Sequence, residues 1–135
     1  MITYQRNKDL PEEQLAALFL SVNWFSGQFP HKLKAAFANS SRVLTAWSGD
    51  KLVGLIRGLD DGVWQATIDC LLVHADYQRQ GIASALLNML MAEYRHFLYI
   101  NVVTDDKKNT SFYLQHGFDV MAEGTPLQIV GNSWQ

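Results

Sequence analysis

The 135-residue sequence predicts a mixed α/β domain. Helical and strand-like segments alternate along the chain: one strand, two helices, three strands, a helix, a strand, a helix and two strands. Three successive strand-like segments are joined by tight turns, and apolar residues make up 48% of the composition, as a packed core requires. We therefore expect a single domain over residues 1–135, with a twisted sheet of about six to seven strands and about four helices.

The first third of the chain carries the patterns of one strand and two helices. Residues Ile2 to Arg6 alternate between apolar and polar, which indicates a short strand. The run Asp9-Leu10-Pro11-Glu12 combines a capping acid, an early proline and a glutamate, so a helix should begin here and end near Ser21. Pro30 begins a second helix, and Asn39-Ser40-Ser41 ends it.

The middle third predicts an antiparallel meander. Arg42 to Ser48, Lys51 to Leu59 and Trp64 to Val73 have the composition of strands. The runs Gly49-Asp50 and Asp60-Asp61-Gly62 between them are typical of tight turns.

The last third predicts two more helices and three strands. Ser84 to Tyr94 form the strongest helical pattern. Phe97 to Val103 form an uninterrupted apolar run, as expected of a central, buried strand. A short helix follows over Lys108 to His116, and two weaker strands are expected over Phe118 to Ala122 and Leu127 to Val130.

Charge and composition argue against several classes of function. The formal net charge is −2 and the longest basic run is Lys107-Lys108, which argues against a nucleic-acid partner. We find no apolar stretch suited to a signal peptide or a membrane span, so we expect a cytoplasmic protein without a membrane partner. The single cysteine, Cys70, is expected to be a small buried hydrophobe, and the spacing of the four histidines predicts no metal site.

A polar turn between the strand ending at Val73 and the helix after it has the features of a phosphate site. Backbone N–H groups in the first turn of a helix lack internal partners, and the helix dipole is positive there. An anion at this place is therefore stabilised by the backbone itself. Gly81 removes a Cβ where an anion would approach, Ala83 is nearly as small, and Arg79 adds a charge and a forked donor.

The run Gln78-x-x-Gly81-x-Ala83 resembles the Gln/Arg-x-x-Gly-x-Gly/Ala signature of the GCN5-related N-acetyltransferase (GNAT) family. The order of elements resembles that family's fold over nearly the whole chain. The resemblance implies that the turn binds the pyrophosphate of acetyl-coenzyme A (acetyl-CoA). It also implies that the edge of the preceding strand binds the pantetheine arm through its backbone. The coenzyme-binding residues expected here are Leu71, Leu72, Val73, Gln78, Arg79, Gln80, Gly81, Ile82, Ala83 and Ser84.

A second stretch, Asn109 to Phe118, resembles the family's helix and turn that end in Tyr-x-x-x-Gly-Phe. The resemblance implies that Tyr113 lies beside the coenzyme sulfur and acts as a general acid for the leaving thiolate. It also implies that Phe112 contributes to the coenzyme site and that Asn109 contacts pantetheine. Alternatively, Phe112 and Tyr113 pack this helix onto the sheet. The sequence departs from the family pattern at Asp106, where an asparagine is common.

Attack by an amine requires removal of a proton, and Asp69 is the leading candidate for the base. It is the one acid in an apolar strand, and burial without a partner would raise its pKa. Alternation places its side chain on the same face as Leu71 and Val73. Glu123 and His74 are weaker candidates. The sequence around His74 is typical of an exposed surface turn.

Aromatic side chains in the early part of the chain are candidates for the acceptor site. Trp24, Phe25 and Phe29 lie between the two predicted helices, and Trp47 or Trp64 from the sheet are further candidates. Such rings suit an aryl or aliphatic amine. The alternative is that they cover the core. Arg57 interrupts an apolar strand and either meets an acidic group of the acceptor or faces solvent.

These observations predict that the protein transfers acetyl from acetyl-CoA to a primary amine by direct attack in a ternary complex. The main hypothesis is that this amine belongs to a small molecule. No metal is expected. Two alternatives remain at this point: a regulatory module that binds acetyl-CoA without catalysis, and an enzyme that acetylates a protein lysine or N-terminus. A homodimer is compatible with the exposed aromatics and the weak terminal strands.

Overall fold

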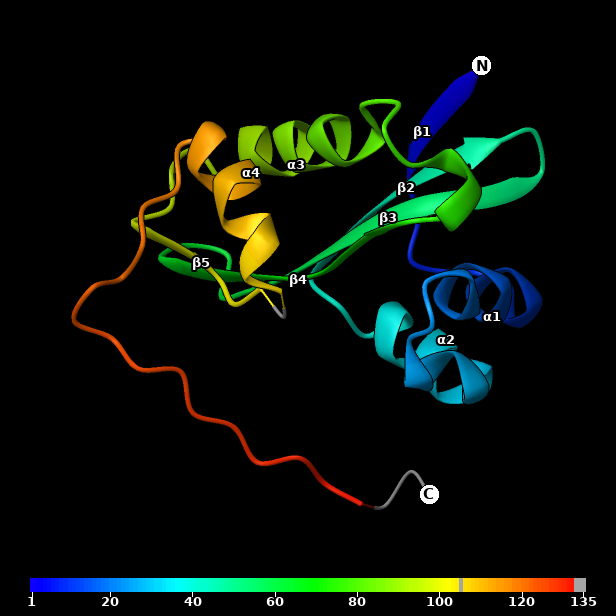
Figure 1. The fold of residues 1–135 in the computed structure, drawn as a ribbon, viewed down its shortest axis with the longest axis horizontal. Helices are drawn as coiled ribbons and strands as arrows, with labels where there is room; N and C mark the ends of the chain where they lie inside the picture. Colours follow the sequence, from blue (N-terminus) through cyan, green and yellow to red (C-terminus); the bar gives the residue numbers. More distant parts are fainter. Residues whose placement is uncertain (105, 133–135) are drawn as a thin grey trace. The chain divides into compact units, whose positions relative to one another are not determined.

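The computed structural model describes residues 1–104 and 106–132 (Figure 1). The chain divides into two compact units, Met1–Asn101 and Val102–Gln135, and each is described by itself. The mixed α/β class and the order of the first nine elements agree with the sequence prediction.

The first unit holds one sheet, three α-helices and two short 3-10 turns. The strands are β1 (Ile2–Arg6), β2 (Arg42–Ser48), β3 (Lys51–Asp60), β4 (Gln65–Val73) and β5 (Tyr99–Val102), the last of which reaches into the second unit. The helices are α1 (Glu12–Ser21), η1 (Phe25–Gln28), α2 (Pro30–Ala38), η2 (Ala75–Tyr77) and α3 (Ile82–Glu93). The second unit holds η3 (Lys107–Asn109) and α4 (Thr110–Gln115).

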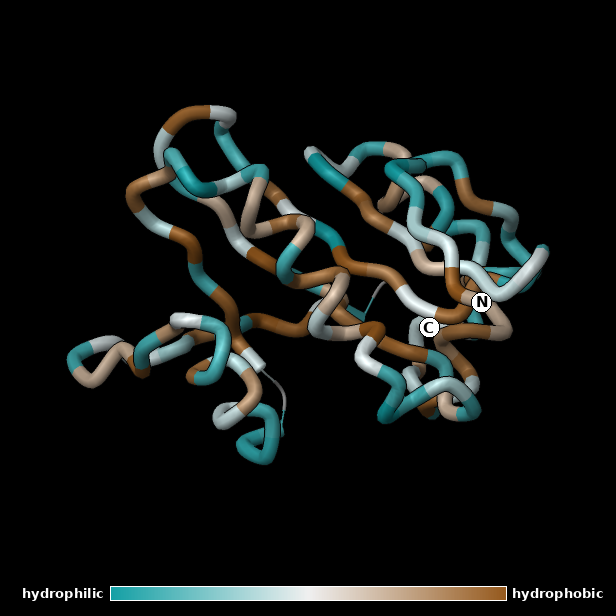
Figure 2. The backbone as a smooth tube through the Cα atoms, turned by 90° about the horizontal axis from the view of Figure 1, so that it is seen from above, coloured by the Kyte–Doolittle hydropathy of each residue, from teal (hydrophilic) through white to brown (hydrophobic). Residues whose placement is uncertain are grey.

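The five strands lie in the order β1-β2-β3-β4-β5. The pairs β1–β2, β2–β3 and β3–β4 are antiparallel, so the predicted meander and both of its tight turns are confirmed. The connection from β4 to β5 runs through α3, which is the crossover that a parallel pair of strands requires. Long apolar runs follow the strands of the sheet (Figure 2).

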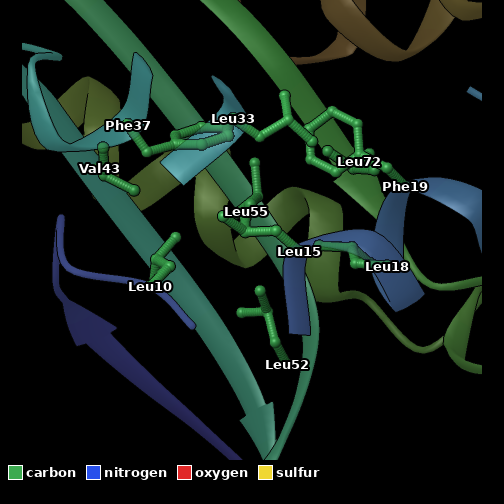
Figure 3. Packing of buried hydrophobic residues seen from close by; sticks show 10 residues of the cluster. All are labelled: Leu10, Leu15, Leu18, Phe19, Leu33, Phe37, Val43, Leu52, Leu55 and Leu72. Carbon is green, nitrogen blue, oxygen red and sulfur yellow. The ribbon is translucent and has the colours of Figure 1, made fainter. Parts of the chain in front are cut away.

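The helices of the first unit cover both faces of the sheet. Helices α1 and α2 pack on one face, and α3 packs on the other (Figure 1). The core between α1, α2 and the sheet is built from apolar side chains that are almost fully buried (Figure 3), namely Leu10, Leu15, Leu18, Phe19, Leu33, Phe37, Val43, Leu52, Leu55 and Leu72. This burial is the main stabilising contribution to the fold.

Helix α3 lies unusually close to strand β3, and two glycines make this possible. A Cβ added at Gly54 would lie 3.1 Å from Ile82 Cγ2. A Cβ added at Gly58 would lie only 2.0 Å from the hydroxyl oxygen of Tyr94, which is fully buried. Gly58 is therefore required by the close approach of this ring and not by backbone conformation.

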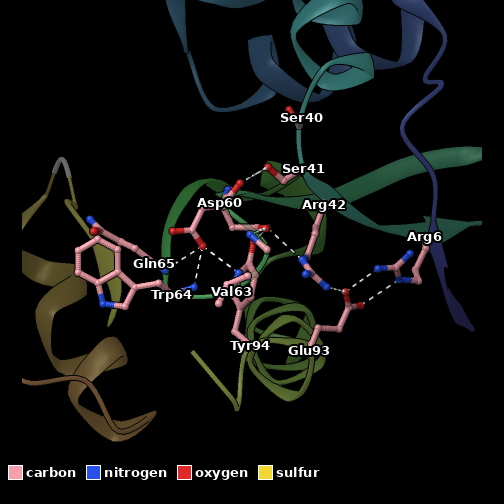
Figure 4. A network of polar contacts seen from close by, with 12 residues as sticks. Arg6, Ser40, Ser41, Arg42, Asp60, Val63, Trp64, Gln65, Glu93 and Tyr94 are labelled. Carbon is pink, nitrogen blue, oxygen red and sulfur yellow. Dashed lines mark hydrogen bonds and ion pairs between the residues drawn. The ribbon is translucent and has the colours of Figure 1, made fainter. Parts of the chain in front are cut away.

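A polar network fixes the C-terminal end of α3 to the sheet (Figure 4). Tyr94 donates a 2.7 Å hydrogen bond to Asp60, which also accepts a 3.0 Å bond from Arg42. Glu93 accepts from Arg42 at 3.2 Å and from Arg6 Nε at 3.0 Å. Burial and the Asp60 hydrogen bond raise the pKa of Tyr94, while the hydrogen bond from Arg6 lowers the pKa of Glu93.

Within residues 1–104 and 106–132 the sheet has five strands, not the six to seven that the sequence predicted. Residues Phe118–Ala122 and Leu127–Val130, which the sequence predicted as strands, belong to no strand in the structure. Their alternating apolar pattern is compatible with β structure, but a strand also needs a paired neighbour to satisfy its backbone.

The prediction of a central, buried strand over Phe97–Val103 was wrong in both length and position. Strand β5 covers only Tyr99–Val102, lies at the end of the sheet, and has no buried residue. An apolar run indicates a strand, but it does not say whether a neighbour lies on both sides.

Candidate active site

The turn between β4 and α3 has the backbone geometry of an anion site. Gly81 is the N-cap of α3 and has a left-handed backbone (φ +82°), and a Cβ added there would meet no atom within 4 Å. No side chain caps the helix. The N–H group of Ala85 bonds to the Gly81 carbonyl at 3.0 Å, so the N–H groups of the three helical residues before it have no intrahelical acceptor.

Several side chains hold this turn in place. The amide of Gln78 donates to the Val73 carbonyl at 3.2 Å, so the first residue of the motif closes the turn. The Ala75 N–H donates to the Ser21 hydroxyl at 3.1 Å, which ties the segment to the end of α1. Arg79 has φ +65° and is exposed, and among the described residues its guanidinium makes no ion pair. Its charge is therefore available to an anion.

The remaining predicted residues of the motif line the start of α3. Gln80 is exposed in the turn, whereas Ile82 is buried against the sheet. Ala83 and Ser84 are half-buried in the first helical turn. The predicted helix start at Ser84 is two residues late, because the helix already begins at Ile82.

His74 is buried, with 8% of its surface exposed, so the prediction of an exposed surface histidine was wrong. Its Nδ1 accepts the N–H of Asp76 at 3.1 Å, and its ring packs edge-on against Tyr77. Burial, together with the nearby Lys51, lowers the pKa of the imidazole. With its Nδ1 lone pair committed to the turn, His74 acts as a cap of η2 and is poorly placed to take a proton from an acceptor.

Strand β4 carries a bulge at Cys70. Arg57 pairs with Asp69 and Leu55 with Leu72, so Cys70 and Leu71 both lie opposite the single residue Ile56. Cys70 has φ +57° and is only half-buried, where the sequence predicted a buried residue. Left-handed backbone at a non-glycine residue within a strand marks a bulge, which re-aims the side chains around it.

The bulge overturns the prediction about which side chains share a face of β4. Leu55 and Arg57 are two residues apart on β3 and share one face, so their partners Leu72 and Asp69 share that face too. Leu72 belongs to the core under α1 and α2. Asp69 therefore lies on the α1/α2 face with Leu72, and not with Leu71 and Val73.

Asp69 is paired, contrary to the expectation of burial without a partner. Its carboxylate forms a salt bridge with Arg57, and its side chain is 46% exposed. The Arg57 side chain is 17% exposed and lies over the ring of Phe37 of α2, with its guanidinium carbon 5.4 Å from the ring centroid. Arg57 Nε is buried without a hydrogen-bond partner. Arg57 therefore points into the protein, while the Asp69 side chain stays partly exposed.

The backbone of Leu71–Val73 is bordered differently on its two sides. Leu72 and Val73 pair with β3. On the other side, β5 has four residues and its first N–H donates to Trp64, just before the start of the nine-residue β4. The C-terminal part of β4 therefore extends past β5, which leaves backbone groups next to the turn at Gly81 without a neighbouring strand in the described part of the chain.

The predicted aromatic acceptor residues fall into two groups. Trp24 is half-buried and packs edge-on against Phe19 of the core, at 5.6 Å between ring centroids. Phe25 is 52% exposed and contacts Phe29, with 5.3 Å between the centroids. Phe25 and Phe29 thus present an aromatic surface, while Trp24 supports it from the core.

The two further tryptophan candidates, Trp47 and Trp64, also differ in exposure. Trp47 is partly buried against the core, and its indole N–H donates to Thr45 at 2.8 Å. Trp64 is exposed and contacts Tyr99 edge-on.

Tyr113 lies on α4, in the second unit. It contacts Phe112 and Phe118 edge-on, at 5.2 and 5.5 Å between centroids, so the end of the motif forms a small aromatic cluster. Burial raises the pKa of the Tyr113 hydroxyl above its usual value near 10. The phenol is thus held in its protonated form at neutral pH.

The other predicted residues of the second unit are more exposed. The Asn109 side-chain amide donates to Thr104 at 3.3 Å. Glu123 is exposed in the segment after α4 and makes no ion pair among the described residues.

The structure brings the turn at Gly81 and the end of β4 together in the first unit, and it adds the Arg57–Asp69 pair, which sequence reasoning missed. A signal for the pair was available in the hairpin, since the two residues are equidistant from Val63 in the turn. No group of three or more potential metal ligands occurs within residues 1–104 and 106–132, and none of the helices described there is long and apolar enough to cross a bilayer.

Comparison with known proteins identifies the family. The sequence profile described as the acetyltransferase (GNAT) family matches residues 8–118. The chain belongs to the GNAT family. The uncharacterized N-acetyltransferase ycf52 from Pyropia yezoensis is 30% identical over 118 residues, which cover 83% of this chain and 67% of that protein.

Solved structures show the GNAT fold across nearly all of the chain. A GNAT-family acetyltransferase from Streptococcus pneumoniae is 28% identical and superimposes with a TM-score of 0.84, covering 98% of this chain and 100% of that one. A probable acetyltransferase from Staphylococcus aureus gives 0.85 at 18% identity, with the same coverage, and so supports the fold alone. The predicted family and fold class are thus confirmed.

Proposed function

We propose that the protein transfers the acetyl group of acetyl-CoA to a primary amine of a small molecule. The observation that carries this proposal is the turn at Gly81, where a left-handed glycine, an uncapped helix start and an unpaired Arg79 meet. Membership of the GNAT family supports acetyl transfer as the reaction. Because the family match covers residues 8–118, it also spans both compact units and supports a single functional domain.

The residues present suit the parts of acetyl-CoA. The pyrophosphate would accept hydrogen bonds from the N–H groups of Ile82, Ala83 and Ser84, and Arg79 would add a charge-assisted bond. The amide groups of pantetheine would pair with the backbone of Leu71–Val73, as a peptide pairs with the edge of a sheet. Asn109 and Phe112 are proposed to contact the same arm.

The proposed reaction is direct attack of the neutral amine on the thioester carbonyl. A C–N bond forms, the C–S bond breaks, and the products are an acetamide and coenzyme A. Asp69 would receive the proton that the amine loses, directly or through a water molecule. Tyr113 would protonate the departing thiolate, and its raised pKa keeps that proton available at neutral pH. Most of the rate enhancement would come from holding the two substrates together.

The acceptor is proposed to be a small amine with an apolar body. The exposed Phe25 and the half-buried Phe29 beside it supply an apolar surface that also attracts a cation. Asp69 supplies a negative charge on the face of the sheet that α1 and α2 cover. Arg57 is proposed to orient Asp69 and not to bind the acceptor directly, because it is mostly buried over Phe37.

The direct test is calorimetric titration with acetyl-CoA and with coenzyme A, followed by measurement of coenzyme A release across a panel of amines. We expect one-site binding in the micromolar range and turnover with at least one small amine. Binding without turnover on small amines or on lysine and N-terminal peptides would favour a regulatory module, and turnover on the peptides alone would favour a protein acetyltransferase. Absence of binding to either form would contradict the proposal.

Replacing Tyr113 by phenylalanine is expected to lower kcat by about 100-fold, because a general acid typically contributes at least this much. Coenzyme affinity should stay within about twofold, since the ring contacts with Phe112 and Phe118 remain. The measurement is steady-state kinetics on the best amine, with Tyr4→Phe in β1 as the control.

The raised pKa of Tyr113 also fixes a pH dependence. Deprotonation of this phenol should set in at higher pH than for an unburied tyrosine, so any alkaline decline of the wild-type kcat that is absent from the Tyr113→Phe variant should be displaced to higher pH than an ordinary phenol would give. Unchanged kcat and an unchanged pH profile in that variant would remove the assigned acid role.

A further inference from the structure

His74 connects the end of β4 to the turn at Gly81, and its main chain and its ring both hold the backbone between them. Its N–H donates to the Val53 carbonyl at 2.8 Å, which continues the antiparallel pairing of β4 with β3. Its carbonyl accepts the N–H of Tyr77 at 2.8 Å, and its Nδ1 accepts the N–H of Asp76 at 3.1 Å. His74 therefore winds η2, the 3-10 turn that leads into the turn at Gly81.

The bond from Asp76 requires a neutral imidazole. A ring nitrogen that accepts an N–H must keep its lone pair, so the proton of the neutral ring lies on Nε2. A second proton, on Nδ1, would place one donor against another, and η2 would lose the bond at its N-cap. The side-chain acceptor at an N-cap satisfies an N–H group that the first turn leaves without an internal partner.

The surroundings of the ring also disfavour a positive charge. His74 is 8% exposed, and its ring lies edge-on to Tyr77, with 5.7 Å between the centroids. In the described part of the chain, the charged groups that act on the ring are Lys51 of β3 and Asp76 of η2. Burial has the largest effect and, together with Lys51, lowers the pKa of the imidazole, although the negative charge of Asp76 acts in the other direction.

We propose that His74 is a positioning residue for acetyl-CoA, which holds the turn at Gly81 in its binding shape only while the imidazole is neutral. This inference rests on the proposed function, because it concerns the same coenzyme site. Protonation would release the N–H of Asp76 and loosen the segment that places Gln78 and Gly81. The turn needs such support, because Arg79 has a left-handed backbone (φ +65°) that is unfavourable for a residue with a Cβ.

The direction of the pH effect follows from the two states of the turn. In the closed turn the pKa of His74 is lowered, whereas in an opened, hydrated turn it would return towards its usual value of about 6.5. The closed turn is therefore fully favoured above about pH 6.5. Below that value it is disfavoured by up to about tenfold for each pH unit, until the pH passes the lowered pKa. Simple attraction between an imidazolium and the coenzyme phosphates would have the opposite sign, because it would tighten binding at low pH.

The test is calorimetric titration with coenzyme A at several values between about pH 8 and pH 5, with two full-length variants beside the wild type. In His74→Asn the amide oxygen replaces Nδ1 as the acceptor at the N-cap, and it does not titrate. His31→Asn is the matched control, because it makes the same substitution at a side chain of α2 that is 88% exposed. Titration of the coenzyme's own phosphates is common to all three proteins and cancels when their dissociation constants are compared.

The dissociation constant of the wild type, divided by that of His74→Asn, should rise by at least about threefold from pH 8 to pH 5. His31→Asn should follow the wild type within about twofold. A ratio that stays constant or falls on acidification overturns the inference, as does a His31→Asn variant that abolishes the pH dependence. Absence of coenzyme A binding by the wild type at pH 8 contradicts the proposed function itself, whereas binding and turnover with a constant ratio contradict this inference alone.

Nuclear magnetic resonance of the wild type supplies a second readout that needs no variant. As the pH is lowered, the amide signals of Asp76 and Gly81 should move together with the ring signals of His74. Their common midpoint should lie below the usual histidine value of about 6.5. A Gly81 amide that does not follow the ring would show that protonation of His74 leaves the turn unchanged, and the inference would be wrong.

Discussion

Replacing Gly81 by leucine is expected to weaken acetyl-CoA binding by about 1,000-fold, or about 4 kcal/mol. Gly81 is the N-cap of α3 and has φ +82°. A side chain there would stand where a phosphate must approach the first N–H groups of the helix. The left-handed backbone is also unfavourable for any residue with a Cβ, so the turn would tend to change its conformation. The turn would then lose both its access and its shape. Calorimetric titration measures the change directly.

Gly62 provides a closely matched control. It has φ +83°, a Cβ added there would also meet no atom within 4 Å, and it lies in the hairpin turn between β3 and β4. Gly62→Leu should therefore cost a similar amount of stability from backbone strain, about 1–2 kcal/mol, without affecting the coenzyme. Equal losses of affinity in the two variants would mean that Gly81 acts through stability alone, and full affinity in Gly81→Leu would remove the turn from the site.

Replacing Gly58 by alanine should destabilise the protein by about 3 kcal/mol, at the upper end of overpacking effects. The new Cβ would lie 2.0 Å from the hydroxyl oxygen and 2.9 Å from the Cζ atom of Tyr94. Tyr94 cannot easily move away, because its hydroxyl is bonded to Asp60 and its ring lies against Arg42 and Phe97. Urea unfolding monitored by circular dichroism gives the free energy of unfolding.

Two further variants separate this clash from a general loss of flexibility in β3. At Gly54 the nearest atoms lie 3.1 and 3.3 Å away, at the ends of the Ile82 and Leu86 side chains, so Gly54→Ala should cost only about 1 kcal/mol. Combining Gly58→Ala with Tyr94→Phe removes the Tyr94 hydroxyl oxygen, which is the atom closest to the new Cβ. The free energy of unfolding of the double variant should be at least about 1 kcal/mol higher than the sum of the two single effects predicts. Additive effects would show that the contact with Tyr94 is not the cause.

The parts of the fold that follow from local chemistry could be predicted from the sequence. The tight turns at Gly49-Asp50 and Asp60-Asp61-Gly62 fix the meander, because glycine and aspartate favour their backbone conformations. The turn at Gly81 could be predicted for the same reason, since this residue combines freedom of conformation with the start of an amphipathic helix. Each of these signals lies within a few residues of the feature that it predicts.

The parts that depend on neighbours distant in sequence could not be predicted in this way. Whether β5 is central or at an edge depends on what pairs with it, and its composition does not contain that information. His74 is buried by Tyr77 and the turn folding over it, although its own sequence context is polar. The pairing of Asp69 with Arg57 needed the register of a hairpin and the position of its irregularity.

The bulge at Cys70 changes which side chains of strand β4 point to which face of the sheet. Up to Asp69 the odd-numbered side chains face α1 and α2, and from Leu72 the even-numbered ones do. Deleting one residue here would restore regular pairing and relieve the left-handed backbone, but it would turn either Asp69 or Leu72 to the opposite face. A more regular strand would thus be gained only by turning one of these two side chains away from the face that α1 and α2 cover. The left-handed backbone at this one residue is what places Asp69 and Leu72 on the same face of β4.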